Sequence, residues 1–476
     1  MTRKFRGVLP TKALPASLAL LLTLPVFAAD WSEQDLATAA ALRDKAQSGT
    51  MAYEHVSSLV TEVGPRFAGS AGDAAAVRWA LNRLGTHGFS KVRTQDVLVP
   101  RWIRGTAEVS IVAPYPQPLV AVSIGGSIGT SEEGIEAPVV AVESLDALKA
   151  LPASTVSGKI VFIDERMQKT RDVSGYGAAV AKRSQGPSIA GNLGAVALVI
   201  RSAGTSPDRI AHTGGLNYRT DAPRIPAFAL SNPDADILAR QVKSDKPVRM
   251  HLRSTARELP PAWSANVIGE IPGGEKANEI VLLGAHLDSW DLAQGAVDDG
   301  AGVAIVMEAA RLIGKLDRKP ARTIRVVLFA NEEFGLSGAR EYARLAGDEI
   351  NHHVVAFEAD LGAGPVWRLQ SRVSEEALPA VATMHEVLAP LEIESGDNTA
   401  SGGSDIGPLR MAGVPVMDLS LDATAYFDIH HTVNDTLAKI DPKTLDQSVA
   451  AYAAAAWLAA NKQGDFGRLP TETSTR

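Results

Sequence analysis

Residues 279–303 place side chains that could bind a metal ion directly after an apolar run. The apolar run has the length of a buried strand, and the residues after the segment have the spacing of a helix. His286 and Asp288 stand at the end of the run, and Asp298 and Asp299 lie in the polar loop that follows. A lone histidine in this position is more often structural, and Asp-Asp-Gly is more often a turn. The metal hypothesis therefore depends on the rest of the chain.

Three later polar clusters follow other predicted strands. They are Glu332 and Glu333, then Asp360, then a late loop with His430, His431 and Asp435. Adjacent acids repel unless a cation or a proton offsets their charge. Side chains one residue apart on a strand point to opposite faces, so Glu332 and Glu333 are predicted to have different roles. Carboxylate oxygens with imidazole nitrogens suit zinc, with manganese or cobalt as alternatives, and a pair of metals needs one bridging carboxylate.

A serine hydrolase is a rival interpretation. Residues 125–129, GGSIG, match the nucleophile-elbow pattern G-x-S-x-G around Ser127. That elbow requires a strand before the serine and a helix after it. Here Gly134 and Pro138 fall within the following segment, which disfavours a helix. We therefore do not expect Ser127 to be a nucleophile.

The elements that must position these side chains alternate between strand and helix after residue 264. Strands are predicted at 266–270, 279–286, 323–330, 354–358 and 414–419. Helices are predicted at 300–316, 336–346, 374–391 and 442–462, the last with Asp441 as N-cap and Pro442 at the first helical position. This alternation predicts an α/β fold with a mostly parallel central sheet covered by helices. Ligands of such sheets bind beyond the carboxyl ends of the strands, where the polar clusters fall.

The first half of the chain is expected to contain part of the same domain and a second unit. Residues 31–89 have helical patterns, and strand-like runs follow at 92–99, 107–112 and 119–124. Residues 130–258 alternate short β-rich runs with helix-like pieces, and 258–261 form a proline-containing linker. We therefore expect a signal peptide at 1–28, an N-terminal part of the main domain at 29–129, an inserted β-rich domain at 130–258 and the rest of the main domain at 259–476. The inserted unit has no convincing ligand set.

The remaining histidines have no partner in any motif. His212 and His251 in the inserted unit are expected to be surface or structural residues. The same expectation covers His55, His87, His352, His353 and His385.

Composition narrows the class of protein and its compartment. The 476 residues are 45% hydrophobic and 21% charged with a net charge of −7, so nothing suggests a nucleic-acid partner. The absence of cysteine excludes disulfides, thiolate zinc sites and a cysteine nucleophile. Basic residues before the apolar segment 13–27 predict a secretory signal peptide cleaved after Ala28. No other stretch is long and apolar enough to span a membrane, so we expect a periplasmic or extracellular location without membrane attachment.

Several motifs in this order resemble the co-catalytic zinc exopeptidases that include bacterial leucyl aminopeptidase. They are HLDSWDLAQGAVDDGAG, ANEEFGLSGA, FEADLGAG and FDIHHTVNDT. GPRFAGSAGD, WIRG, GGSIGT and SGGSDIGPLRMAGVPV extend the resemblance, over nearly the whole mature chain, to the carboxypeptidase Q (plasma glutamate carboxypeptidase) family. The resemblance implies a zinc-exopeptidase fold. It also implies that residues 130–258 are a protease-associated domain.

Carried over by position, the resemblance implies two zinc ions per chain. One is held by His286, Asp298 and Asp360, and the other by Asp298, Glu333 and His431, so that Asp298 bridges them. The three carboxylates offset most of the charge of two zinc ions, which lowers the cost of burying the site.

The family pattern assigns further roles around these ligands. It implies that Glu332 is the general base, which takes a proton from water and passes it to the leaving amine. It also implies a cis peptide bond between Asp298 and Asp299. Asp288 is expected to orient His286, and Asp435 either to support the His431 loop or to lie in an exposed turn.

His430 departs from the pattern. Several relatives have a tyrosine before the last zinc ligand, and that tyrosine hydrogen-bonds the tetrahedral intermediate. We hypothesise that His430 donates this bond here. His431 is preferred over His430 as the ligand because the family pattern places the metal histidine directly before the x-x-x-Asp-Thr run.

The resemblance implies a secreted metalloexopeptidase of carboxypeptidase or dipeptidase type that acts on dipeptides or short peptides. An aminopeptidase of the same family is the first alternative, and a non-catalytic binding protein on the same fold is the second. The group that recognises the substrate terminus cannot be assigned from these patterns, although Ser404 and Asp405 in the loop 401–406 are candidates for a pocket wall. The sequence leaves the oligomeric state open, and a homodimer is one candidate because relatives of this type are often dimers.

Overall fold

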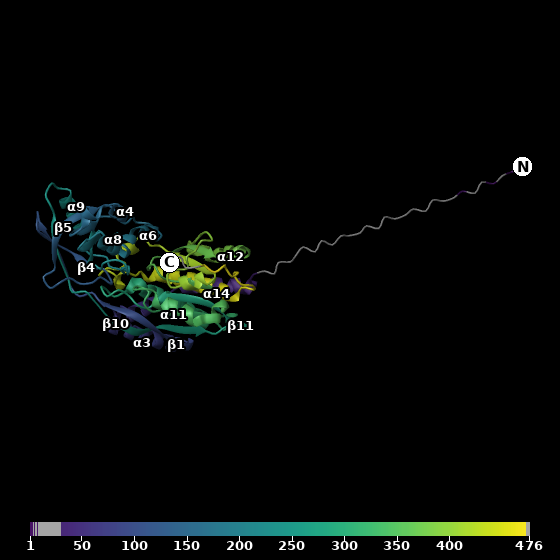
Figure 1. Ribbon diagram of the computed structural model, residues 1–476. Coiled ribbons are helices and arrows are strands. Elements are labelled where there is room, and N and C mark those ends of the chain that lie inside the picture. Colours follow the sequence, from purple (N-terminus) through teal and green to yellow (C-terminus); the bar gives the residue numbers. More distant parts are fainter. Residues whose placement is uncertain (3, 5–6, 8–29, 473–476) are drawn as a thin grey trace.

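The computed structural model describes residues 1–2, 4, 7 and 30–472, which form two eight-stranded sheets with helices around them. Figure 1 shows helices α4 (Leu145–Lys149), α8 (Gly186–Asn192) and α9 (Asn232–Val242) grouped with one sheet. Helices α11 (Ser337–Ala346), α12 (Leu378–Leu388) and α14 (Pro442–Asn461) lie with the other. The predicted cleavage site after Ala28 lies outside the described residues.

The first sheet carries the predicted site. In spatial order its strands are β1 (Ser90–Ile103), β10 (Arg257–Ile271), β12 (Arg322–Phe329), β11 (Lys276–His286), β13 (His353–Glu358), β16 (Val416–Leu421), β14 (Val366–Arg372) and β15 (Glu394–Ser395). The four central strands, β12, β11, β13 and β16, are parallel to one another. This confirms the predicted mostly parallel centre. The strands β10 and β14 join it antiparallel, and β14 and β15 were not predicted.

Helices cover both faces of this sheet because the strand β11 is apolar on both sides. Val281 and Leu283 pack in the core cluster that contains α10 (Ala301–Gly314) and α14. Ile280 and Leu282 pack in the opposite cluster, which contains residues of α11 and α13 (Gly407–Met411). Neighbouring residues of a strand face opposite ways, so a continuous apolar run requires a cover on each face. The predicted helix-covered sheet is confirmed.

The remaining helices of this layer come from both ends of the chain. The helices α1 (Glu33–Gln47), α2 (Ala52–Glu62) and α3 (Ala71–Thr86) pack with α10 and α14. The side chain of Asp441 accepts a hydrogen bond from the amide of Lys443, which confirms the predicted N-cap of α14. Segments far apart in sequence therefore form one core.

The second sheet is built from residues 107–254. In spatial order its strands are β3 (Gln117–Leu119), β2 (Ala107–Ala113), β9 (Arg249–Ser254), β5 (Ile135–Val142), β6 (Ile160–Ile163), β7 (Ala197–Arg201), β8 (Ala227–Leu230) and β4 (Ala121–Ser123). Three of these strands, β2, β3 and β4, precede residue 130, where the sequence places the start of the inserted unit. Helices α4, α5 (Ala153–Val156), α6 (Ser174–Ala179), α7 (Ala181–Ser184), α8 and α9 lie between its strands in sequence.

The predicted linker at 258–261 is wrong, because these residues belong to β10. This part of β10 pairs only with β1, with Leu259 opposite Arg101 and a register shift beside it. Its other side has no strand neighbour until Val267, where pairing with β12 begins. An unpaired side and a register shift are the places where a strand tolerates proline, so Pro260 and Pro261 do not end it. The ends of β1 and β10 connect the two sheets.

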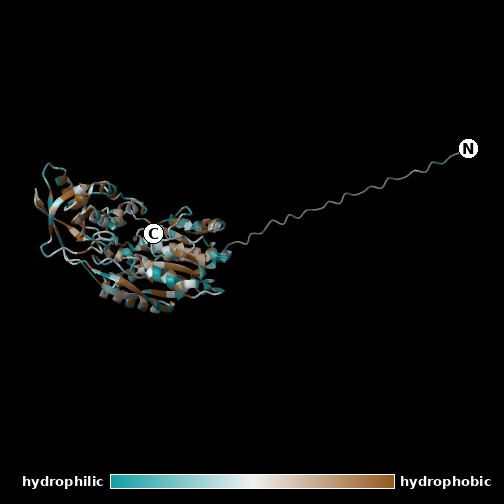
Figure 2. Ribbon diagram, in the orientation of Figure 1, coloured by the Kyte–Doolittle hydropathy of each residue, from teal (hydrophilic) through white to brown (hydrophobic). Residues whose placement is uncertain are grey.

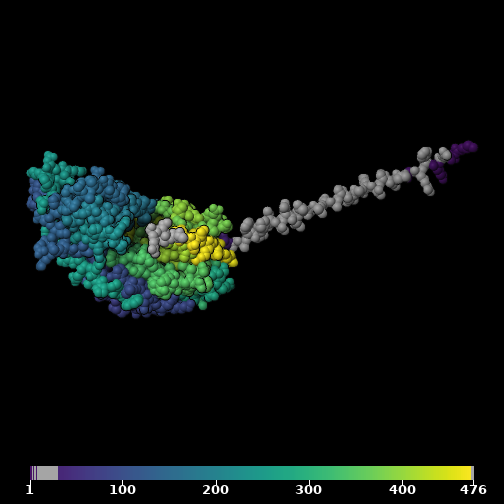
Figure 3. Space-filling model, in the orientation of Figure 1, coloured from purple at the N-terminus to yellow at the C-terminus, as the bar shows by residue number. Residues whose placement is uncertain are grey.

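Brown segments of the ribbon in Figure 2 mark hydrophobic residues, which occur on strands in both lobes. Figure 3 shows residues of about 107–254, in blue and teal, as a lobe beside the lobe coloured green to yellow. None of the helices between residues 30 and 472 is long and apolar enough to cross a membrane.

Candidate metal centre

The predicted site residues meet at one edge of the first sheet. His286 is the last residue of β11, and Glu332 and Glu333 follow β12. Asp360 follows β13, and the loop with His430 and His431 follows β16. Because β12, β11, β13 and β16 are adjacent and parallel, their carboxyl ends open at the same edge. This topology brings together residues separated by more than 140 positions in sequence.

The first donor group consists of His286, Asp298 and Asp360. Nε2 of His286 lies 3.2 Å from Oδ1 of Asp298 and 3.9 Å from Oδ1 of Asp360. One potential ligand atom from each residue lies within 4.8 Å of the other two. This is the set predicted to hold the first zinc ion.

The second donor group consists of Asp298, Glu333 and His431. Nε2 of His431 lies 3.2 Å from Oδ2 of Asp298 and 2.8 Å from Oε2 of Glu333. These donor atoms also lie within 4.8 Å of one another. The group matches the predicted second zinc set.

Asp298 belongs to both groups, and its two oxygens face different imidazoles. Oδ1 faces His286, whereas Oδ2 faces His431. The peptide bond between Asp298 and Asp299 is cis, which confirms that prediction. The geometry is that expected of a bridging carboxylate.

The donor set fits two divalent cations. Oδ2 of Asp298 and Oε1 of Glu333 are buried and have no hydrogen-bond partner among the described residues. Burial raises the pKa of Glu333 well above its ordinary value, that of Asp360 to about 6 and that of Glu332 to about 7. Buried carboxylates that lack donors are stabilised by cations. Two imidazoles and three carboxylates suit zinc.

Asp288 supports the site differently from the prediction. Nδ1 of His286 lies 3.1 Å from the backbone carbonyl oxygen of Asp288, but 3.7 Å from its carboxylate. The carboxylate instead accepts a hydrogen bond of 3.0 Å from the amide of Glu332. Asp288 therefore orients His286 through its backbone and the Glu332 segment through its side chain. Asp299 fixes the intervening turn by accepting bonds from the amides of His286 and Gly302.

Asp435 is buried, so the exposed-turn alternative is wrong. Its carboxylate accepts hydrogen bonds from the amides of Val297 and Asp298, at 2.7 and 3.2 Å. It thus holds the bridging residue rather than the His431 loop. Arg66, which the sequence analysis missed, binds the same turn because its guanidinium donates to the carbonyls of Leu287 and Gly295.

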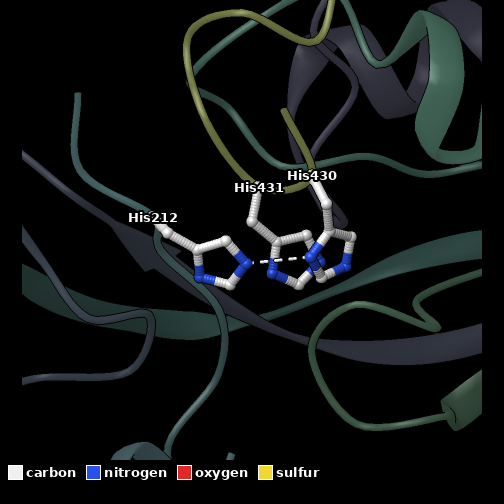
Figure 4. Close-up of side chains that lie close together, drawn as sticks. All are labelled: His212, His430 and His431. Atoms are coloured by element: carbon white, nitrogen blue, oxygen red, sulfur yellow. Dashed lines mark hydrogen bonds between the residues drawn. The ribbon is translucent and has the colours of Figure 1, made fainter. Parts of the chain in front are cut away.

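His430 and His431 stack, with ring centroids 3.5 Å apart. Nε2 of His430 lies 3.4 Å from Oδ2 of Asp298. On its other side, Nδ1 of His430 lies 2.8 Å from Nε2 of His212, a bond drawn in Figure 4. His212 is 2% exposed, so it is not a surface residue, and its bond to His430 gives it a partner that the sequence did not reveal. It comes from the second sheet's lobe and reaches the site because the amide of Thr213 bonds the carbonyl of His431.

A cavity of about 360 Å³ opens onto both donor groups. Glu332, His430 and Ser404 line it, together with residues of the second lobe such as Arg183 and Asn217. Ser404 therefore forms part of the wall, as predicted for its loop. Asp405 is buried behind it, where its amide donates to Glu358.

Ser127 is not placed for nucleophilic attack. It is 1% exposed, its hydroxyl donates to the carbonyl of Ile128, and it accepts a bond from the amide of Ala227. No helix follows it, as expected. The glycines of this motif allow close packing, because a Cβ on Gly125 would lie 2.1 Å from the ring of Trp290.

The other histidines have no place in the donor groups. His55 lies beside Glu308, and His353 bonds the hydroxyl of Tyr342. His87, His251 and His385 each lie within hydrogen-bond distance of backbone carbonyls, and His352 is exposed. Their expected structural or surface roles agree with these positions.

Known proteins share both the sequence and the fold. Residues 266–456, which contain all five proposed ligands, match Peptidase family M28. Carboxypeptidase Q of Rattus norvegicus is 35% identical over 411 residues, which cover 86% of this chain and 85% of that protein. The crystal structure of a Peptidase M28 precursor from Shewanella amazonensis is 47% identical with a TM-score of 0.90, covering 92% of this chain and 99% of that one.

A zinc aminopeptidase from Bacillus subtilis shares the fold at 22% identity, with a TM-score of 0.65 and coverage of 88% of this chain and 97% of that one. The carboxypeptidase Q match extends well outside the segment that carries the ligands, and it spans most of both proteins. The chain therefore belongs to peptidase family M28 and is a metallopeptidase.

Proposed function

We propose that this protein is a dizinc exopeptidase of carboxypeptidase or dipeptidase type that hydrolyses dipeptides or short peptides. The observation that carries the proposal is the pair of donor groups that share Asp298. His286 and Asp360 would hold one ion with Asp298, and Glu333 and His431 would hold the other. When bound, the ions supply Lewis-acid chemistry that polarises the scissile carbonyl and acidifies water.

Glu332 acts as the general base. It lines the cavity, and Asp288 fixes its backbone amide. No described residue hydrogen-bonds to its carboxylate, so the carboxylate is available to water and substrate. It takes a proton from the attacking water and delivers it to the leaving amine.

His430 stabilises the oxyanion that develops on the scissile carbonyl. Its ring lines the cavity beside His431, and His212 holds it from the far side. A donor fixed before the reaction stabilises developing charge without reorganisation. His430 thus takes the place of the tyrosine expected at this position.

The test combines metal removal with substitution of the base. Chelation is expected to abolish dipeptide hydrolysis, and added zinc to restore it with two ions per chain by elemental analysis. Glu332→Gln is expected to lower kcat by at least about 100-fold, a general-base contribution, while zinc content stays at two. Full activity of either the metal-free protein or Glu332→Gln would refute the proposal.

The carboxypeptidase assignment is supported by relatives named carboxypeptidase Q, which are 33–35% identical. An aminopeptidase is the alternative, and peptides with one blocked terminus separate the two. Cleavage of N-blocked but not C-blocked peptides is expected. The reverse pattern would establish an aminopeptidase.

We also propose that the mature protein is periplasmic or extracellular and forms a homodimer. Basic residues before an apolar segment near the N-terminus support export. Mass spectrometry of the exported protein is expected to find Ala29 at its N-terminus. Light scattering is expected to give twice the mass of one chain, and a mass of one chain would refute the dimer.

A further inference from the structure

The two histidines of the donor groups differ in what holds their second ring nitrogen. Nδ1 of His286 lies 3.1 Å from the backbone carbonyl oxygen of Asp288. Nδ1 of His431 is buried and has no hydrogen-bond partner among the described residues. A histidine that binds a metal through one ring nitrogen carries a proton on the other, and this N–H almost always donates to an acceptor. His431 therefore needs an acceptor that its protein neighbours do not provide.

Two neighbours of His431 also have a buried polar atom without a partner within residues 30–472. They are Trp290, at Nε1, and Glu333, at Oε1. Trp290 is 4% exposed, and its ring centroid lies 5.7 Å from that of His431. Glu333 has its other oxygen, Oε2, 2.8 Å from Nε2 of His431, where the second ion would bind. A carboxylate that binds a metal through one oxygen is usually hydrogen-bonded as well, which leaves Oε1 for that bond.

A small cavity of about 10 Å³ is lined by all three of these residues, together with others such as Ala293 and Thr432. Its volume is that of one water molecule, far too small for a substrate. The hydroxyl of Thr432 already donates to the carbonyl of Ile429 and accepts the amide of Asn434. The polar groups that still need a partner at this cavity therefore include two N–H donors and one carboxylate oxygen.

We infer that the cavity binds one structural water, through which Trp290 positions His431 and Glu333. The water accepts hydrogen bonds from Nε1 of Trp290 and Nδ1 of His431, and it donates one to Oε1 of Glu333. Two N–H donors disfavour a cation at this place, and the carboxylate disfavours an anion, whereas a water both accepts and donates. The inference rests on the proposed function, because zinc at Nε2 of His431 fixes the proton on Nδ1.

The water would support only the second ion. It fixes the ring plane of His431 and the direction of the Glu333 carboxylate, which both belong to the second donor group. His286 and Asp360 of the first group do not line the cavity. Loss of the water is therefore expected to weaken one zinc site and to leave the other unchanged.

Crystals of the zinc-loaded protein test the water directly. One ordered water is expected in the cavity, within about 2.7–3.2 Å of Nε1 of Trp290, Nδ1 of His431 and Oε1 of Glu333. A metal ion or a dry cavity at this place would overturn the inference.

Site-resolved zinc affinity tests the role of Trp290. Trp290→Phe keeps an aromatic ring but removes the N–H donor. Anomalous diffraction from crystals equilibrated in zinc buffers gives the occupancy of each site. The zinc concentration that half-fills the second site is expected to rise about tenfold, a usual effect of losing such a supporting group, and that of the first site to stay within about twofold.

Two further variants keep this test decisive. Ala293→Val fills the cavity without removing a polar group, so the same selective rise is expected. Trp367→Phe is the matched control, because Nε1 of Trp367 also lacks a partner among the described residues, but Trp367 does not line the cavity. Both zinc sites are expected to keep their affinity in Trp367→Phe.

Cobalt in place of zinc gives a spectroscopic readout. The Nδ1–H proton of a histidine bound to paramagnetic cobalt(II) gives an exchangeable NMR signal far from those of other protons. In Trp290→Phe, the signal of His431 is expected to move and to exchange faster with solvent. The signal of His286 is expected to stay, because its acceptor is the carbonyl of Asp288.

The outcomes separate this inference from the proposed function. Equal weakening of both zinc sites in Trp290→Phe, or an unchanged His431 signal, would overturn the positioning role of Trp290. Unchanged affinity of the second site in both Trp290→Phe and Ala293→Val would do the same. If the zinc-loaded wild type holds the water but cleaves no peptide, the proposed function fails while the inference about the water stands.

Discussion

Nε2 of His212 lies 2.8 Å from Nδ1 of His430, so the lobe of the second sheet contributes a side chain to the candidate metal centre. Burial lowers the pKa of both imidazoles well below the ordinary value, and both are therefore neutral. One proton is then shared between the facing nitrogens. The oxyanion role proposed for His430 requires the proton on Nε2, so Nδ1 accepts a hydrogen bond from Nε2 of His212.

Replacement of His212 is expected to impair catalysis through His430. His212→Leu leaves Nδ1 of His430 without a donor, so kcat is expected to fall about 10- to 100-fold with little change in KM or zinc content. His212→Gln offers an amide N–H donor and is expected to recover part of the loss. Steady-state kinetics and zinc analysis of both variants provide the test. Equal losses in the two variants, or loss of zinc, would argue against a positioning role.

Asp435 is expected to control metal affinity without being a ligand. Its carboxylate accepts hydrogen bonds from the amides of Val297 and Asp298. Asp435→Ala removes both bonds and therefore loosens the turn that carries the bridging residue Asp298. Zinc affinity is expected to fall about 10- to 100-fold, as is typical when a supporting group is lost. The zinc affinity of Asp435→Ala and of the wild type is measured by competition with a chromophoric chelator.

The matched control for Asp435 is Asp441→Asn. It also removes one negative charge, but at the exposed N-cap of α14, where asparagine caps as well as aspartate. Unchanged zinc affinity is expected in this variant. If Asp435→Ala binds zinc as the wild type does, the support assigned to Asp435 is incorrect.

The features of the fold and of the metal centre that the sequence predicts correctly are those that a short run of neighbouring residues specifies. The apolar run of β11 and the polar residues after it predict both a central strand and the strand end that carries His286. The contact of His212 leaves no such pattern, because its partner lies on another element far along the chain. His212 meets His430 across 218 positions. The prolines of β10 suggested a linker because the sequence does not reveal which side of a strand lacks a neighbour.

Glu308 is expected to stabilise the fold in a pH-dependent way. Burial alone raises its pKa, but hydrogen bonds from Arg311, the proximity of His55 and the amide of Met51 outweigh burial and lower the pKa to about 2. A depressed folded-state pKa adds stability above the unfolded value near 4.5, and this stability is lost as the pH falls toward 2. Glu308→Gln is therefore expected to lower the free energy of unfolding by about 2–3 kcal/mol at pH 7.

Urea unfolding at pH 7, 4 and 3 tests this expectation. The difference in the free energy of unfolding between wild type and Glu308→Gln is expected to shrink as the pH falls below 4.5. Glu54→Gln removes an exposed carboxylate of α2 and is expected to change the stability by less than about 0.5 kcal/mol at each pH. If Glu308→Gln lowers the free energy of unfolding by the same amount at pH 7 and at pH 3, the low pKa of Glu308 is contradicted.

Ser127→Ala tests the rival serine-hydrolase chemistry. The Ser127 hydroxyl is buried, and it joins the carbonyl of Ile128 to the amide of Ala227. Its removal is expected to cost about 1–2 kcal/mol of stability, because the Ala227 amide loses its acceptor. The turnover number of the zinc-loaded variant is expected to stay within about twofold of the wild type, since the hydroxyl does not reach the cavity lined by Glu332. Thermal unfolding and dipeptide hydrolysis measure the two effects separately. A folded, zinc-loaded Ser127→Ala protein without turnover would return the nucleophile-elbow interpretation to consideration.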